Sequence, residues 1–278
     1  MSGTDATDGQ NTSPTGEAVR TAAPRRAGVL RTLHAGPDLL VLPNAWDAAT
    51  ARAVVAAGYA AVATSSGAVA GSLGYGDHEQ APADEMLAAA ARIARAVDVP
   101  VTADVESGYG WTPTELVDRL TTAGIAGCNL EDTDHSTGEL RAAGKQAEYL
   151  RSVRDALDAA GADLVLNARV DTFLHPDDPT RQLEAGIERA RAYADAGADC
   201  VYPIVLTDAD ALRTFVDALR PTPVNALLLP ATPAFAVLRE IGVRRVSLGG
   251  GMFRAVQRVV GELATGVATG ETARLFRS

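Results

Sequence analysis

The sequence contains little cysteine and almost no lysine. Its 278 residues include two cysteines, Cys128 and Cys200, too few for a disulfide framework. Both lie in apolar stretches, so we expect reduced thiols buried in the core. Lys145 is the one lysine among 25 basic residues. It falls well after a predicted strand, in a loop or the first turn of a helix, which disfavours a Schiff-base aldolase.

Long apolar runs and an excess of positive charge are also absent. No stretch of about 18 uncharged apolar residues occurs, which argues against a membrane-spanning helix. The formal net charge of −10 argues against a nucleic-acid partner. The first 26 residues lack the apolar segment of a signal peptide and are rich in Ser, Thr, Gly, Ala and Asp. We therefore expect a disordered tail over residues 1–26, a single domain over 27–278, and a cytoplasmic protein.

Eight short apolar runs recur along the domain, with starts 21 to 39 residues apart. They are rich in Val, Ile, Leu and Ala, which is typical of strands buried on both faces, and each gap leaves room for a helix. The runs are Leu39–Leu42, Ala60–Thr64, Val99–Ala103, Ile125–Leu130, Asp163–Ala168, Asp199–Pro203, Thr222–Ala226 and Arg244–Leu248.

Helix signals fill the gaps between these runs. Thr112-Pro113-Thr114-Glu115 has a capping residue, a first-turn proline and an acid three residues past the cap. Gly58, Gly124 and Gly197 each end a helical stretch just before a strand. Eight such units predict an α/β fold of the (β/α)8 TIM-type barrel. A doubly wound sheet is the alternative, and the even spacing favours closure.

Polar residues gather at the carboxyl ends of the predicted strands, where barrel enzymes carry their active sites. Asp104, Glu106 and Glu131 follow two adjacent strands, so their carboxylates are predicted to lie at one rim. Carboxylates this close repel each other unless a cation or proton intervenes, which indicates Mg²⁺ or Mn²⁺ with oxygen ligands. The alternative is that these acids pair with Arg169 or cap the following helices.

Four further features of this rim have both a functional and a structural interpretation. Arg169 could bind a carboxylate or a developing oxyanion, or it could simply pair with Glu131. Residues 65–67 (Ser-Ser-Gly) could cradle a carboxylate or form an ordinary turn. His135 could be an acid or base or an exposed loop residue, and the glycines 249–251 could bind phosphate or allow close packing.

In order and spacing, these motifs resemble the isocitrate lyase/phosphoenolpyruvate mutase superfamily over residues 28–265. The segments that carry the resemblance are Leu42–Asp47 (LPNAWD), Ser65–Gly67 with Ser72–Gly74 and Asp77, Pro100–Gly110 (PVTADVESGYG), Asn129–Asp132 (NLED), Asn167–Asp171 (NARVD) and Gly197–Asp199.

The resemblance implies a Mg²⁺-dependent barrel that acts on small 2-oxo or 2-hydroxy carboxylates through an enolate. It also implies a homo-oligomer, a tetramer or dimer, in which neighbouring subunits exchange a C-terminal helix. By position, Asp104 would be the principal metal ligand and Arg169 would stabilise the enolate. Asp77, Glu106 and Glu131 would hold the water molecules bound to the metal. The substrate-binding residues would be Ser65, Ser66, Gly67, Trp46 and Asn225.

Three departures from the family pattern leave the reaction open. Glu106 replaces the second aspartate of the usual Asp-x-Asp pair. The loop over residues 133–141 lacks the cysteine of the lyases and the Lys and Asn of the phosphonate mutases. Ile204 stands where the lyases carry a glutamate.

The sequence therefore supports three functional hypotheses. The first is cleavage of a C–C bond next to a carboxylate, with Arg169, Glu131 and His135 as catalytic residues and closure of the loop 133–145 over the site. The second is P–C chemistry, as in a phosphonopyruvate hydrolase or a mutase. The third is a non-catalytic barrel that binds a metal and a carboxylate.

Overall fold

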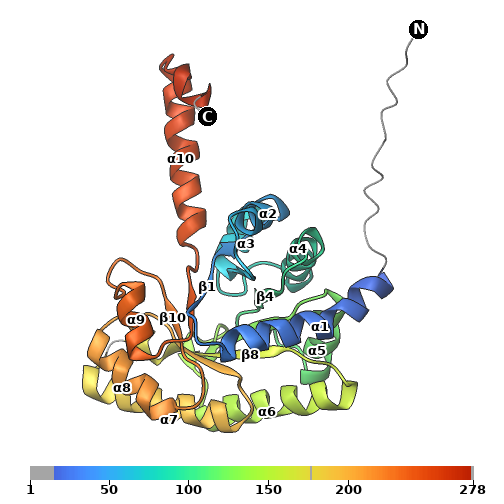
Figure 1. Cartoon of the computed structure of the whole chain (residues 1–278), viewed down its shortest axis with the longest axis vertical. Coiled ribbons are helices and arrows are strands. Elements are labelled where there is room, and N and C mark those ends of the chain that lie inside the picture. The colour runs from blue at the N-terminus through green and yellow to red at the C-terminus, as the bar shows by residue number, and fades with distance from the viewer. Residues whose placement is uncertain (1–15, 176, 277–278) are drawn as a thin grey trace.

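The computed structural model describes residues 16–175 and 177–276, which form a barrel of parallel strands surrounded by helices (Figure 1). The barrel strands are β1 (Leu40–Leu42), β2 (Asn44–Ala45), β3 (Val62–Thr64), β4 (Val101–Asp104), β5 (Gly127–Glu131), β8 (Val165–Val170), β9 (Cys200–Pro203), β10 (Asn225–Leu227) and β11 (Arg245–Ser247). A short hairpin, β6 (Thr133–Asp134) and β7 (Glu139–Leu140), follows β5.

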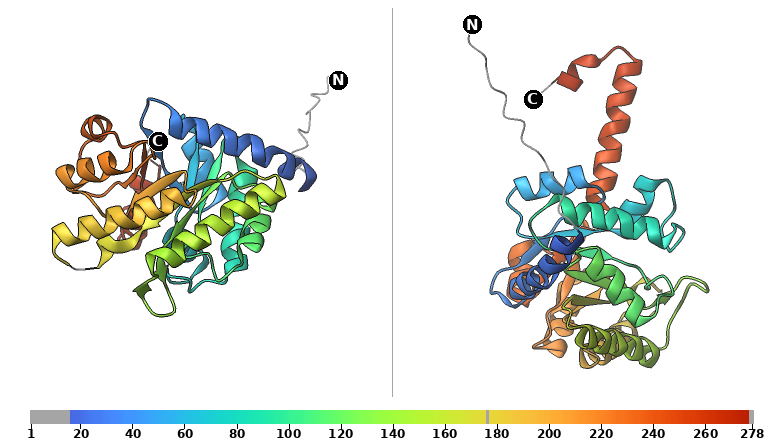
Figure 2. Two further views of the ribbon diagram at one scale, coloured as in Figure 1. Left: turned by 90° about the horizontal axis from the view of Figure 1, so that it is seen from below. Right: turned by 90° about the vertical axis from the view of Figure 1, so that its right-hand side faces the viewer.

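Helices connect these strands and surround the barrel in two further views (Figure 2). They are α1 (Gly16–Ala35), α2 (Ala48–Ala56), α3 (Ser66–Leu73), α4 (Ala83–Ala96), α5 (Pro113–Thr122), α6 (Ala143–Ala160), α7 (Pro179–Asp195), α8 (Ala209–Leu219), α9 (Phe235–Ile241) and α10 (Gly251–Ala268), with the 3-10 turns η1 (Asp171–Leu174) and η2 (Thr272–Phe276).

The hydrogen bonding of the strands confirms the predicted barrel. Six strands pair in the order β2-β3-β4-β5-β8-β9, and three pair in the order β1-β11-β10. Pro43 separates β1 from β2, which are two parts of the first barrel strand, because proline cannot donate to a ladder. A parallel bridge between Val201 and Val224 joins β9 to the strand of β10 and closes the ring.

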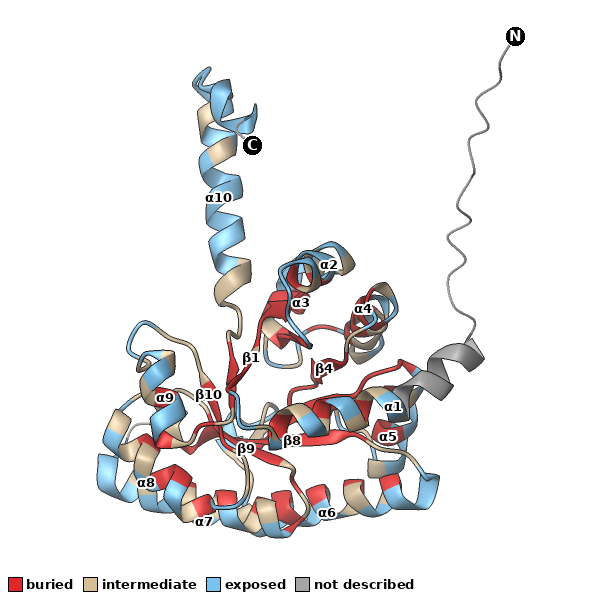
Figure 3. Ribbon diagram, in the orientation of Figure 1, coloured by how far each residue is buried: buried red, intermediate tan, exposed pale blue. Residues whose placement is uncertain are grey.

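Burial follows the predicted pattern. The strands lie buried inside the molecule and the helices are buried on one face, as the residues coloured red in Figure 3 show. Every residue of β3, β5, β8 and β9 is buried, as expected for strands covered on both sides. Thr112 and Glu115 form the predicted capping box at the start of α5. Gly58, Gly124 and Gly197 take the left-handed conformation that ends each preceding helix.

Helix α1 closes the amino-terminal end of the barrel. Ala27 and Leu30 are fully buried against the first residues of several strands. Gly127 permits this contact, because a Cβ there would lie 2.7 Å from the carbonyl oxygen of Val165 and 3.0 Å from Leu30. The structure differs from the predicted tail over residues 16–26, which belong to α1 because Ala, Arg and Glu favour helix. Residues 1–15 of that tail lie outside the described residues.

Both cysteines are free and fully buried in the barrel. Burial raises the pKa of the Cys128 and Cys200 thiols to about 12. They are therefore protonated at neutral pH and behave as small apolar side chains, as the sequence predicts.

Helix α10 extends away from the barrel (Figure 1). None of its residues is buried, and Val256, Val259 and Val260 are between 42% and 52% exposed. Only its first turn contacts the body of the molecule, where Phe253 packs edge-to-face on Trp46 with ring centroids 5.2 Å apart. No described helix is long and apolar enough to cross a membrane.

His34 near the end of α1 is expected to make stability fall at acidic pH. Its ring is 3% exposed, and Nδ1 lies 2.8 Å from the carbonyl oxygen of Leu30. Burial lowers the pKa of His34 to about 4, and the nearby Arg245 guanidinium adds to the effect, with Arg31 and Asp199 also close. Protonation therefore favours the unfolded chain, whose histidine has a pKa near 6.5.

This contribution to the free energy of unfolding is complete above about pH 6.5 and falls by roughly 3 kcal/mol as the pH drops to about 4. Urea denaturation at several pH values should show a shallower pH dependence for His34→Gln than for the unaltered protein. His175→Gln, at a half-buried position in the turn after η1, is the matched control. Equal slopes for the protein and His34→Gln would contradict the assignment.

Candidate active site

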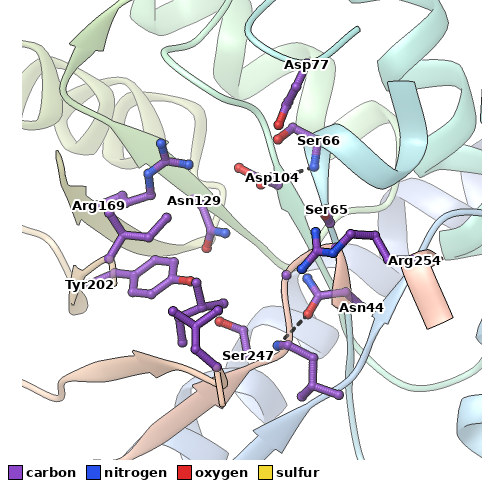
Figure 4. Close-up of a pocket in the computed structure, with 16 residues that line it drawn as sticks. Asn44, Ser65, Ser66, Asp77, Asp104, Asn129, Arg169, Tyr202, Ser247 and Arg254 are labelled. Atoms are coloured by element: carbon purple, nitrogen blue, oxygen red, sulfur yellow. Dashed lines mark hydrogen bonds between the residues drawn. The ribbon is translucent and has the colours of Figure 1, made fainter. Parts of the chain in front are cut away.

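A cavity lies at the carboxyl ends of the barrel strands, where the sequence predicts the site (Figure 4). It encloses about 610 Å³, part of which is open to solvent. Its lining comes from almost every barrel strand and from the start of α10. The lining residues are Asn44, Ser65, Ser66, Asp77, Asp104, Asn129, Arg169, Tyr202, Ile204, Leu227, Leu229, Ser247, Leu248, Gly249, Gly250 and Arg254.

Two carboxylates form the acidic side of the cavity. Asp104 ends β4, and its Oδ2 accepts a hydrogen bond from the backbone N–H of Ser66 at 3.2 Å. Asp77 reaches the start of α3, where a Cβ at Gly67 would lie 2.6 Å from its Oδ2, so any larger residue at position 67 would displace the Asp77 carboxylate. Burial raises the pKa of Asp104, and the neighbouring Asp77 raises it further, although Arg169 opposes this shift.

Arg169 lies across the cavity from these acids (Figure 4). Asp171 holds the guanidinium with both carboxylate oxygens, at 2.5 Å from Nε and 2.8 Å from Nη2, and Glu131 pairs with Nη1. Burial alone would lower the pKa of Arg169, but the Glu131 and Asp171 carboxylates raise it well above its ordinary range. Arg169 is therefore a permanent cation in a fixed orientation.

Glu131, His135 and Glu106 form a group beside Arg169 that does not line the cavity. His135 Nε2 lies 2.5 Å from Glu131 Oε1 and 4.0 Å from Glu106 Oε2. Glu106 Oε2 also accepts a hydrogen bond of 2.5 Å from the backbone N–H of Glu79. The hydrogen bond to Glu131 raises the pKa of His135, and burial raises the pKa of Glu131. The side chain of His135 is only 8% exposed, unlike that of an ordinary loop histidine.

A buried network behind β5 supports Arg169, and the sequence analysis did not identify it. Asp132 is fully buried and accepts hydrogen bonds from the Tyr193 hydroxyl at 2.6 Å and from Arg189 at 3.0 Å. Its other oxygen accepts a hydrogen bond from the backbone N–H of Asp171 at 2.8 Å. The network thereby fixes the residue that holds Arg169, and Asp132 is the last residue of the Asn129–Asp132 motif.

The predicted substrate-binding residues separate into two groups. Ser65 and Ser66 line the cavity. Trp46 instead packs on Phe253, and Asn225 is fully buried and forms a reciprocal pair with Ser247 at 3.0 and 3.2 Å. Gly67 accommodates Asp77, as described above. Direct contact of Trp46, Gly67 or Asn225 with a substrate stays a prediction.

Sequence reasoning missed several residues of the cavity. Tyr202 and Ser247 come from β9 and β11, and Arg254 comes from the first turn of α10. Burial raises the pKa of Tyr202 to about 12, so its hydroxyl stays protonated at neutral pH. The available signal was a polar residue inside or just after an apolar run, as at Ser247.

The acidic side of the cavity fits a hard cation. Within the described chain, Asp77 Oδ1 and Asp104 Oδ1 are buried oxygens without a hydrogen-bond partner. Residues 16–175 and 177–276 contain no group of three or more His, Cys, Asp or Glu side chains that could hold a metal by itself. A cation here would therefore be held by one or two carboxylates, with water and substrate as its other ligands, which is the usual pattern for Mg²⁺.

Comparisons with known proteins agree with this geometry. Residues 30–268 match the family model described as phosphoenolpyruvate phosphomutase. The 2-methylisocitrate lyase of Escherichia coli K12 is 32% identical over 73% of this chain and 71% of its own length.

Two solved structures are similar in fold and sequence. A crystal structure from Burkholderia cenocepacia J2315, provisionally assigned as a phosphonomutase, is 40% identical with a TM-score of 0.81, over 87% of this chain and 99% of its own. The phosphoenolpyruvate phosphomutase of Streptomyces platensis subsp. rosaceus is 26% identical with a TM-score of 0.80, over 90% of each chain. The chain therefore belongs to the phosphoenolpyruvate mutase family of the PEP mutase/isocitrate lyase superfamily, whose members include lyases and mutases.

Proposed function

We propose that this enzyme cleaves a C–C bond of a small 2-oxo or 2-hydroxy carboxylate through an enolate, with Mg²⁺ or Mn²⁺ as cofactor. One observation carries the proposal. Asp77 and Asp104, each with one unpartnered buried oxygen, line the same cavity as the Arg169 guanidinium. This arrangement suits a ligand that is anionic and can also chelate a cation.

Each residue of the cavity has a role in this reaction. Asp104 would hold the cation directly. Asp77 would hold it directly or through water. Glu106 and Glu131 would hold it in the same ways after their side chains rearrange. The bound cation would supply a Lewis acid next to the substrate carboxylate. Ser65 and Ser66 would bind that carboxylate. Arg169 would stabilise negative charge on the enolate oxygen as the C–C bond breaks.

The proton that the enolate takes up is assigned to the group beside Arg169. His135 and Glu131 are hydrogen bonded, so a proton can be shared between His135 Nε2 and Glu131 Oε1, and His135 itself or a water molecule held by Glu131 would deliver it to the enolate carbon. His135 belongs to the turn between β6 and β7, inside the segment 133–145 that we propose closes over the cavity and excludes water.

The protein is proposed to act as a homo-oligomer, a tetramer or dimer, in the cytoplasm. Helix α10 supports this proposal, because it has valines on its surface and packs on the barrel only at its first turn. Exchange of α10 between subunits would cover those valines. No nucleic-acid or membrane partner is proposed.

P–C bond chemistry is the second candidate. The similarity to a provisionally assigned phosphonomutase at 40% identity favours it. The same cavity could bind phosphonopyruvate, and release of inorganic phosphate from that compound would identify a hydrolase, whereas its conversion to phosphoenolpyruvate would identify a mutase.

Oxalate binding tests the proposed site, because oxalate is a planar dianion that imitates a chelated pyruvate enolate. Isothermal titration calorimetry should show oxalate binding at least about tenfold tighter with Mg²⁺ than without it. Binding would justify a screen of oxo and hydroxy diacids and then of phosphonopyruvate. Failure of oxalate to bind in the presence of Mg²⁺ would contradict the enolate site and favour a non-catalytic barrel.

A further inference from the structure

Arg245 is a charged side chain inside the barrel, below the cavity. It is 0% exposed and begins β11. Its Nη2 donates a hydrogen bond of 3.1 Å to Asn129 Oδ1, whereas Nε and Nη1 have no partner among the described residues. A fully buried guanidinium with one protein acceptor is costly, so the bond that it does form is strongly favoured.

This bond fixes the orientation of the Asn129 side chain. An amide can present either its oxygen or its nitrogen to a neighbour, and the hydrogen-bond network decides which. A guanidinium has donors and no acceptor, so Arg245 requires the oxygen of Asn129 to face it. The same oxygen accepts a second bond of 2.8 Å from Asn167 Nδ2, which agrees with that orientation.

The amide nitrogen of Asn129 is then directed away from Arg245. Asn129 lies in the middle of β5 and not at its end. Its side chain lines the cavity between Arg169 and Ser247 (Figure 4). No described residue accepts a hydrogen bond from this nitrogen. Its two hydrogens are therefore available to a molecule in the cavity.

We propose that Asn129 is a specificity-determining residue, whose Nδ2 donates a hydrogen bond to an acceptor oxygen of the substrate, and that Arg245 is the positioning residue that fixes this donor. The inference rests on the proposed function, since it places a carboxylate substrate in this cavity. It adds a selection rule. The site favours a ligand with an oxygen acceptor at this position over one that presents an N–H donor there.

Asn129→Asp tests the rule by exchanging the donor for an acceptor. The new carboxylate can still accept hydrogen bonds from Arg245 and Asn167, so the support of the fold is retained. Two ligands are titrated with Mg²⁺ present into the unaltered protein and the variant. They are oxalate and oxamate, which carries an amide in place of one carboxylate. We expect oxalate affinity to fall at least about thirtyfold and the preference for oxalate over oxamate to fall at least about tenfold.

An unchanged preference for oxalate over oxamate in the folded variant would overturn the inference while the proposed function stands. Failure of the unaltered protein to bind oxalate would contradict the proposed function and, with it, this inference. Thermal melting checks that the variant is folded.

A second pair of variants decides the matter if Asn129→Asp does not fold. Arg245→Lys keeps N–H donors toward Asn129 Oδ1 and should leave the oxalate-to-oxamate preference within about threefold of the original. Arg245→Gln can present either a donor or an acceptor, which permits the Asn129 amide to flip. The oxalate-to-oxamate preference should then fall by more than about threefold. Equal preferences in the two variants would overturn the positioning role of Arg245.

Discussion

Replacing Arg169 with lysine is expected to lower turnover by about 10²–10³-fold, the usual effect of losing one donor to a developing oxyanion. Lysine keeps the charge but lacks the planar guanidinium, whose Nε and Nη2 both donate hydrogen bonds to Asp171. The cation would therefore be less well placed for the enolate oxygen. Mg²⁺ affinity should change little, because the unpartnered carboxylate oxygens that we assign to the cation belong to Asp77 and Asp104.

The measurement pairs steady-state kinetics, on the acid that the unaltered enzyme cleaves, with calorimetric titration of Mg²⁺. Arg169→Ala should lose still more turnover, and it should also unfold more easily because the buried Glu131 and Asp171 carboxylates would lose their shared guanidinium partner. Arg52→Lys, at an exposed position of α2, is the matched control. Turnover unaffected by Arg169→Lys would remove the guanidinium geometry from the mechanism.

Asp104→Asn is expected to abolish the Mg²⁺-dependent part of oxalate binding, with a loss of affinity of at least about tenfold in the presence of Mg²⁺. Asparagine has nearly the same shape and its oxygen can still accept the hydrogen bond from Ser66, so the local fold should persist. What it lacks is the negative charge next to Asp77. Calorimetry of oxalate with and without Mg²⁺ measures the effect directly.

Asp118→Asn, at an exposed position of α5, removes a carboxylate far from the cavity and should bind oxalate normally. The assignment of Asp104 would be wrong if its variant kept Mg²⁺-dependent affinity within about threefold of the unaltered protein.

Much of the fold could be predicted because a parallel barrel leaves a local signal in every strand. The run Asp163–Ala168 corresponds to β8, and Arg244–Leu248 contains β11. The boundaries of the elements were less predictable. Pro43 divides the first strand, and α1 begins at Gly16, before the predicted start of the domain. Proline effects and helix propensity at a chain end depend on tertiary packing, which a local pattern does not contain.

The acidic side of the site was also predictable, because Asp104 and Arg169 stand directly at strand ends. Asn129 and Arg245 were not identified as partners. They are 116 residues apart and meet only because the barrel closes. The second arginine of the pair Arg244-Arg245, directly before Val246, was the available signal, and by itself it is compatible with either a strand end or a buried charge.

The buried contact of Arg245 with Asn129, and through it with Asn167, also limits how this sequence can diverge. One guanidinium determines which way two amides point, so a substitution that removes the acceptor at Asn129 or the donors at Arg245 leaves a partner mismatched. Substitutions here should be epistatic, with each tolerated only after a second has occurred. A lineage that acquires a different substrate preference would therefore need to alter the interior of its barrel as well as the surface that the substrate touches.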